Sequence, residues 1–152
     1  TMSPPASNPL PEPIADFFTA NHVLSLATVS GGMPWSASCF YAFDAQSSAL
    51  VMLSSEKTRH GQAMLEHACV AGTIAGQPTS VLQIRGIQFF AEACRLEDDE
   101  KDAAFDFYCL RHPIGRVMRG SVWRLALLEV KFTDNSRIFG NKTLWRRYDA
   151  EE

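Results

Sequence analysis

The chain has 152 residues, so one domain is the default expectation, and it can bury a hydrophobic core without help from a disulfide or metal. It carries 14 basic and 17 acidic side chains, a formal net charge of −3. Nucleic-acid-binding proteins usually carry a basic excess. Composition and charge therefore argue against nucleic acid as a partner.

The four cysteines are far apart in the sequence and form neither a C-x-x-C pair nor a zinc-type cluster with histidine. We expect them to be free thiols in a reducing, cytoplasmic setting. No apolar run approaches the ~20 residues of a membrane span, and the first residues lack the basic-then-apolar order of a signal peptide. We therefore expect a cytoplasmic protein that does not enter a membrane.

The first 13 residues hold five of the eight prolines and show no periodic apolar pattern. Proline removes backbone donors, so residues 1–13 are expected to form a disordered, proline-rich tail. A folded domain is expected over residues 14–148, with an acidic tail at residues 149–152. The domain should open with a short helix at Ile14–Asn21, whose apolar residues share one face.

Three strands are predicted next, at residues 22–29, 35–43 and 49–53, joined by turns at residues 30–34 and 44–48. The middle strand, "WSASCFYAF", alternates with a period of two. That pattern places one set of side chains on one face: Trp35, Ala37, Cys39, Tyr41 and Phe43. The other face should carry Ser36, Ser38, Phe40 and Ala42.

The second half should contain a helix that includes residues 61–67, strands at residues 69–75 and 81–96, a helix at residues 97–112 and a last strand at residues 123–132. Glycine within a strand often marks a bulge, so a bend is expected at Gly86. Residues 133–147 are basic and are expected to be irregular. Tight turns between strands indicate antiparallel pairing. The sequence thus predicts a mainly β fold with short helices, arranged as a small closed or half-open barrel.

Known phosphate-loop, dinucleotide, zinc-protease and serine-hydrolase motifs are absent from the sequence. The histidines are scattered, and His60 and His67 lie about two helical turns apart, too far to share one metal ion unaided. No metal site is predicted.

The segment "LSSEKTRHGQ", Leu53–Gln62, is the strongest candidate for a binding site. Ser54, Lys57 and Arg59 are the residue types that bind a phosphate where a strand meets a helix. Thr58 is a suitable N-cap for that helix, with His60 in its first turn. The other interpretation is an ordinary solvated turn, and the residues alone do not separate the two.

Two weaker candidates remain. Small hydroxyls at Ser36 and Ser38 leave room for a flat ring, or they mark the solvent face of the strand. Basic residues also gather near the end of the chain, around Trp145, and suit either an aromatic phosphate-bearing ligand or a charged surface.

The segment "GGMPWSASCFYAFDAQSSALVMLSSEKTRHGQAMLEHACVAGTI" resembles the opening half of the pyridoxamine phosphate oxidase-like, FMN-binding split barrels. The motifs "EKTRH", "GQP", "IRGIQF", "VW" and "VKFTDN…FGNK" are similar to those of the YhbP-like family within that superfamily. The similarity extends from Ala15 to Trp145.

This resemblance implies a six-stranded antiparallel split β-barrel and a homodimer with FMN in clefts between its subunits. The FMN phosphate would lie on Lys57, Thr58 and Arg59, near Ser54 and His60. The flavin ring or ribityl chain would be lined by Ser36, Ser38 and Phe40. The partner subunit would add residues of the 80–85 segment and the C-terminal part: Ser80, Gln83, Arg85 and Trp145.

The implied function is a flavin-dependent oxidoreductase that uses FMN and a nicotinamide electron donor. The alternative is a non-catalytic module that binds a flavin, haem or another phosphorylated ring in the same cleft.

Overall fold

The computed structural model describes residues 7–136 and 138–149. Its helices are α1 (Glu12–Ala20), α2 (Arg59–Glu66) and α3 (Asp98–Arg111), with short 3₁₀ turns η1 (Val81–Gln83) and η2 (Pro113–Val117). Its strands are β1 (Val23–Ser30), β2 (Met33–Phe40), β3 (Ala42–Asp44), β4 (Ala49–Ser54), β5 (Cys69–Ala75), β6 (Arg85–Arg95), β7 (Ser121–Asp134) and β8 (Lys142–Arg146). None of the described helices has the length and apolar character needed to cross a membrane.

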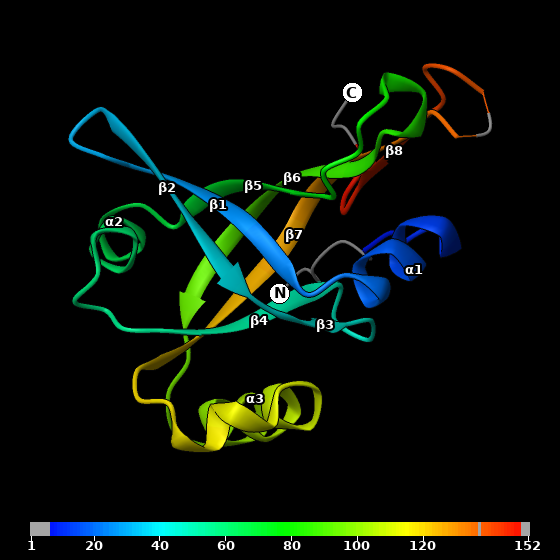
Figure 1. Cartoon of the computed structure of the whole chain (residues 1–152). Helices are drawn as coiled ribbons and strands as arrows, with labels where there is room; N and C mark the ends of the chain where they lie inside the picture. Colours follow the sequence, from blue (N-terminus) through cyan, green and yellow to red (C-terminus); the bar gives the residue numbers. More distant parts are fainter. Residues whose placement is uncertain (1–6, 137, 150–152) are drawn as a thin grey trace.

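The strands form one curled antiparallel sheet in the order β2-β1-β5-β6-β7-β4-β3, and β8 pairs with β7 (Figure 1). Strands β2 and β3 lie at its two edges. The curl brings β2 close to β4, but the two strands share no hydrogen-bond ladder. The sheet is therefore a barrel left open along one side, and the mainly β prediction with short helices is confirmed.

The alternating strands place their apolar side chains inside the curl. On β1 the side chains of Leu24, Leu26 and Thr28 are buried, while their neighbours in the sequence are exposed. Helix α1 packs Ile14 and Phe18 against this core.

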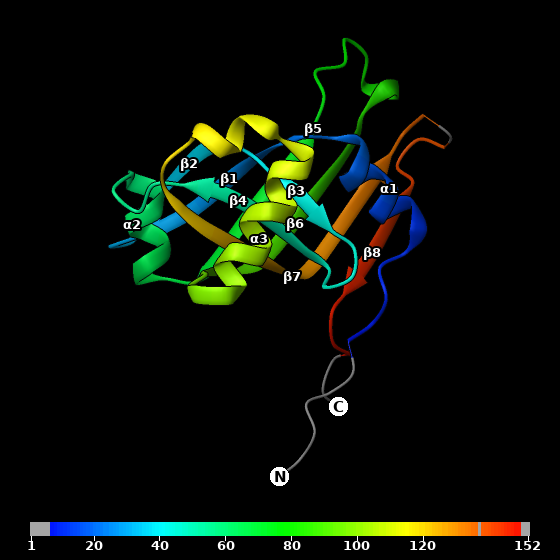
Figure 2. The same ribbon diagram turned by 90° about the horizontal axis from the view of Figure 1, so that it is seen from below.

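Strand β4 is apolar along most of its length because both of its faces are covered. One face meets the main core, and the other lies under α3, which crosses β3 and β4 (Figure 2). The covering layer includes Tyr108 of α3, packed in one cluster with Val51 of β4. The unbroken run "ALVML" follows from this double burial.

The expected strand at residues 35–43 is two strands in the structure. β2 ends at Phe40, β3 begins at Ala42, and both Tyr41 and Ala42 are buried, so the predicted alternation is wrong at this point. Tyr41 donates its hydroxyl hydrogen to the carbonyl oxygen of Phe18 in α1, at 2.7 Å. This tertiary contact turns the chain away from the strand geometry that local alternation predicts.

Two expectations about the second half also need correction. The segment expected to be irregular, residues 133–147, contains β8, which pairs along β7. The long β6 strand shifts register between Phe90 and Ala91, and Gly86 pairs with Ala75 in an unbroken ladder. The irregularity of β6 therefore lies four to five residues beyond the predicted bend at Gly86.

The N-terminal helix begins at Glu12, two residues before the predicted start. Ahead of it, the backbone N–H of Asn8 donates to the carbonyl oxygen of Arg147 at 2.7 Å. Residues 1–6 and 150–152 lie outside the described residues, so the two predicted tails stay predictions there.

Leu26 tests the core. Its side chain is fully buried, so Leu26→Ala should lower the free energy of unfolding by about 2–5 kcal/mol through lost burial and a cavity. Leu144→Ala is the control, because this leucine is 68% exposed, and its effect should stay within about 0.5 kcal/mol. Urea unfolding measures both, and equal losses would contradict the assigned core.

Candidate functional site

A cleft of about 560 Å³ lies in the open side of the barrel, between β2 and the end of β4. Its β2 wall is formed by Ser38, Cys39 and Phe40, and Leu53 and Ser54 of β4 line it as well. The far wall comes from α3 and η2, and apolar atoms dominate the lining. A cleft of this size and character suits a small aromatic ligand.

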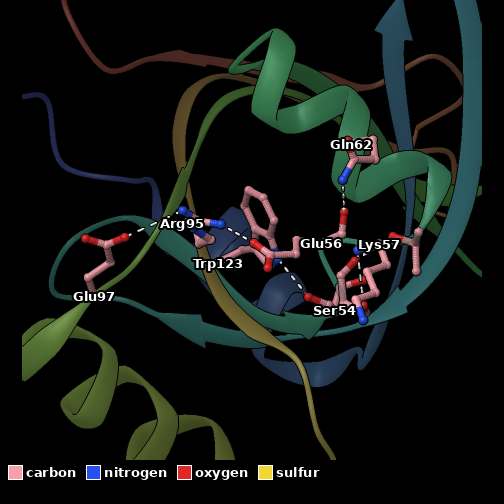
Figure 3. Close-up of polar contacts among 9 residues, drawn as sticks. Ser54, Glu56, Lys57, Gln62, Arg95, Glu97 and Trp123 are labelled. Carbon is pink, nitrogen blue, oxygen red and sulfur yellow. Dashed lines mark hydrogen bonds and ion pairs between the residues drawn. The ribbon is translucent and has the colours of Figure 1, made fainter.

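Ser54 and His60 form the polar end of the cleft. The Ser54 Oγ and His60 Nε2 atoms lie 2.5 Å apart, joining the end of β4 to the first turn of α2. The Ser54 carbonyl oxygen accepts a hydrogen bond of 3.0 Å from the Trp123 indole on β7 (Figure 3). Trp123 is buried, so Ser54 is held by the core itself.

Burial favours the neutral forms of three titratable side chains of the cleft, His60, Cys39 and Tyr108. Burial lowers the pKa of His60 below its ordinary value of 6.5. Burial also raises the pKa of the Cys39 thiol to about 11 and raises that of Tyr108. At neutral pH the cleft therefore offers hydrogen bonds and apolar surface, and it lacks a reactive thiolate at Cys39.

The sequence did not predict that the α3–η2 wall belongs to a ring site. His112 donates from Nε2 to the carbonyl oxygen of Tyr41 at 2.6 Å. Arg111 donates to His22 Nδ1 at 3.1 Å and to the carbonyl oxygen of Thr19. These contacts fix the wall against β2 and α1. The new lining residues are Cys39, Leu53, Tyr108, Arg111, His112, Pro113, Ile114 and Met118.

Most polar groups of the Leu53–Gln62 segment are used within the segment or by its neighbours. Thr58 caps α2 as predicted, since its hydroxyl accepts from the Gly61 N–H at 3.0 Å and donates to the Ser55 carbonyl at 2.7 Å. Glu56 pairs with Arg95 of β6, and its carbonyl accepts from the Gln62 side chain at 2.6 Å (Figure 3).

Lys57 and Arg59 are the two cations of this segment, and both are exposed. Among the described residues, neither forms an ion pair with a carboxylate. The Arg59 guanidinium carbon instead lies 4.0 Å from the centre of the Trp35 ring. Two cations that precede His60 in the chain therefore remain available to an anion beside the cleft.

The predicted site residues are thus only partly brought together within one chain. Ser38, Phe40, Ser54 and His60 line the cleft, while Ser36 lies on β2 outside it. Ser80 and Arg85 border a separate hollow near η1, the turn that contains Gln83, and Arg85 pairs with Asp134 at 3.4 Å.

Trp145 lies in β8 with only 5% of its surface exposed. Its indole packs in the main core and donates to the Asn8 carbonyl at 3.3 Å. The side chain that was expected near a ligand is therefore used inside its own chain, where it holds the segment before α1 against β8.

The chain is 47% identical over 134 residues to a UPF0306 protein of Serratia proteamaculans, covering 88% of this chain and 93% of that protein. It is 44% identical over 139 residues to the UPF0306 protein YhbP of Escherichia fergusonii, covering 91% and 95%. The chain belongs to the UPF0306 (YhbP) family. No protein-family model matches it.

Solved structures of low sequence identity share its fold. A haem-binding protein of Mycobacterium smegmatis matches with a TM-score of 0.74 and 20% identity, over 90% of this chain and 59% of that one. An FAD-binding protein of Mesorhizobium loti matches with a TM-score of 0.64 and 17% identity, over 80% of this chain and 92% of that one. A Listeria innocua protein assigned as a pyridoxamine 5'-phosphate oxidase matches with a TM-score of 0.64 and 13% identity, over 81% of this chain and 97% of that one.

These likenesses confirm the predicted split-barrel fold. The expected strand count of six becomes eight in the described residues, because the second strand is divided at Tyr41 and β8 is added.

The lowered pKa of His60 gives a pH test. The unfolded chain binds a proton at His60 more readily than the folded chain does, so the stabilisation by neutral His60 is complete above about pH 6.5 and is lost as pH falls through the lower folded-state pKa. Urea unfolding across this range should show a shallower acid loss for His60→Gln than for the unchanged protein. His67→Gln, at the exposed end of α2, is the control and should keep the full loss. Identical pH profiles for the protein and His60→Gln would contradict this role.

Proposed function

We propose that this protein binds FMN in the cleft between β2 and β4 and acts as a flavin-dependent oxidoreductase. The observation that carries the proposal is the composition of the cleft, an apolar slot with a few hydroxyl and imidazole groups and two uncommitted cations beside it. The flavin ring is flat and mostly apolar with one polar edge, so it fits this lining. Ser38 and Phe40 would contact the ring, and Ser54 and His60 would hydrogen-bond its polar groups.

The FMN phosphate would lie on the side chains of Lys57 and Arg59. Charge-assisted hydrogen bonds from such donors are the strong ones for phosphate, and Arg59 can bind two oxygens at once. Thr58 contributes differently than expected, because its hydroxyl already accepts from Gly61 and donates to Ser55. It would hold the turn that presents the two cations.

When bound, FMN would accept and pass on the electrons, with a reduced nicotinamide dinucleotide as the proposed donor. The protein would bind the ring, orient its exposed face and exclude water through the apolar α3–η2 wall. His60, Cys39 and Tyr108 stay neutral at neutral pH, so none supplies a charge to the ring.

A non-catalytic module that binds a flavin, haem or another phosphorylated ring is the second candidate. The mostly apolar cleft suits any flat ring, and solved proteins of this fold include a haem-binding one. Against haem, the Nε2 atoms of both cleft histidines are engaged, His60 with Ser54 and His112 with Tyr41. Binding a haem iron through either Nε2 atom would require these contacts to break.

We propose a homodimer formed through the outer face of β2, β1 and β5. The exposed side chains that alternate outward on these strands carry no charge and are mostly small: Val23, Ser25, Ala27, Val29, Ser36, Ser38, Phe40, Cys69, Ala71, Thr73 and Ala75. Such a flat, uncharged face lets a second copy approach closely. In this dimer, the segment around Ser80, Gln83 and Arg85 would be the part that the partner adds to the site.

FMN binding is tested with purified protein by its visible spectrum and by quenching of flavin fluorescence on titration. Lys57→Ala should weaken binding by about 1.5–3 kcal/mol, or about 10- to 150-fold in Kd, because a charged phosphate contact is lost. Lys142→Ala removes an exposed lysine from β8 and should leave Kd unchanged.

A protein that neither binds FMN nor speeds its reduction by NADH or NADPH would overturn the proposed function. Tight FMN binding without turnover would instead favour the non-catalytic module.

The dimer face has its own test. Ala27→Arg places a charge at the middle of the outer β1 face and should convert a dimer to a monomer in light scattering after gel filtration. Gln46→Arg adds the same side chain to the exposed β3–β4 turn and should leave the dimer intact. A monomeric parent protein, or a dimeric Ala27→Arg variant, would refute the assigned face.

A further inference from the structure

The stacked pair of Arg59 and Trp35 is not among the residues that line the cleft. The guanidinium carbon lies 4.0 Å from the centre of the indole ring, and yet 45% of Trp35 remains exposed. The strand beneath the indole is well fixed, since the buried Thr28 donates its hydroxyl hydrogen to the Trp35 carbonyl at 3.2 Å. The pair is therefore an accessible aromatic and cationic surface on a rigid strand.

This surface continues directly from the cleft. Trp35 and Cys39 pair with Thr28 and Leu24, whose side chains both point inward, so the two share a face of β2. They are four residues apart, about 13 Å along a strand at ~3.3 Å per residue. Cys39 lines the cleft at one end of this span, as His60 does. At the other end, Arg59, the residue before His60, stacks on Trp35.

Charge adds a second argument. The nearest carboxylate in the sequence, Glu56, is paired with Arg95, and Lys57 and Arg59 have no carboxylate partner among the described residues. One face of the guanidinium lies on the indole, which leaves its N–H edge and its outer face for a ligand. These two adjacent cations can hold the single phosphate of FMN, and their combined charge also suits a diphosphate.

We propose that Arg59 and Trp35 form a binding site for the adenosine diphosphate part of a dinucleotide whose other ring enters the cleft. The diphosphate lies between Lys57 and Arg59, and the purine stacks on the guanidinium–indole pair. This inference rests on the proposed ring site in the cleft. The same adenosine diphosphate group occurs in FAD and in nicotinamide dinucleotides.

Calorimetric titration with ADP, AMP, FMN, FAD and NADH tests the site on the full chain. ADP should bind saturably and more tightly than AMP, since AMP lacks the second phosphate. Trp35→Leu keeps an apolar side chain on β2 but removes the ring, and it should weaken ADP at least about fivefold without changing FMN. Arg59→Gln should weaken both. Tyr148→Leu and Arg146→Gln are matched exposed controls and should change neither.

The same titrations also identify which dinucleotide supplies the adenosine diphosphate group. FAD binding about tenfold tighter than FMN would assign the adenosine diphosphate to the flavin. Equal flavin affinities with NADH displacing ADP would assign it to a nicotinamide dinucleotide, which would then compete with FMN for Lys57 and Arg59. Absence of ADP binding, or ADP binding unchanged by Trp35→Leu, overturns the inference.

The failure of this inference is distinguishable from that of the proposed function. FMN binding without ADP binding removes the inference alone. ADP binding lost in Trp35→Leu, in a protein that binds no flavin, keeps the adenosine diphosphate site and removes the flavin.

Discussion

The curled sheet of this protein brings its β2 edge beside β4 without joining the two in a ladder, and the site depends on this gap. A closed barrel would fill the space with paired backbone and core side chains. Here α3 and η2 cover one side of the gap, and the Ser54–His60 contact closes one end. The cleft is thus a consequence of topology, and side chains from distant parts of the sequence only decide what it can hold.

The turn between β4 and α2 combines the two interpretations that its sequence left open. The polar groups of Thr58, Ser55 and Glu56 bond within the turn or to a neighbouring strand, as in an ordinary structural turn. Because these groups are committed, the turn is held in one shape. The two side chains that it presents without carboxylate partners, Lys57 and Arg59, are those best suited to an anion. The capping contacts order the turn when the protein folds. Binding an anion there therefore costs little further conformational entropy of the turn.

The sequence predicts well where local rules decide the structure. The Thr58 cap, the end of α3 before Pro113 and the alternating burial of β1 follow from capping, proline and period-two patterns. It fails where a distant contact overrides those rules. Tyr41 hydrogen-bonds to a carbonyl oxygen of α1, and the predicted strand is interrupted there. Trp145 packs into the core, and the basic segment around it, which was expected to be irregular, forms a strand.

Only one wall of the cleft could be predicted from the sequence, for the same reason. Ser38 and His60 could be proposed from strand and turn patterns, but the opposite wall comes from residues about 70 positions after β2 in the sequence. No spacing rule links His112 to Tyr41, whose carbonyl it contacts only after the barrel has curled. Pattern analysis can find one wall of such a site when that wall is a single strand or turn. The second wall requires the topology.

The distribution of charge explains which ligands the site can distinguish. Within the cleft, burial keeps His60, Cys39 and Tyr108 neutral, so a ring is selected there by shape and hydrogen bonds. Arg111 also lines the cleft, but its guanidinium donates to the Thr19 carbonyl oxygen and to His22. The two cations at the start of α2, Lys57 and Arg59, have no carboxylate partner among the described residues. A long polyanion gains from many such contacts and would find few here, whereas one or two phosphates next to a flat ring use every group that the site offers.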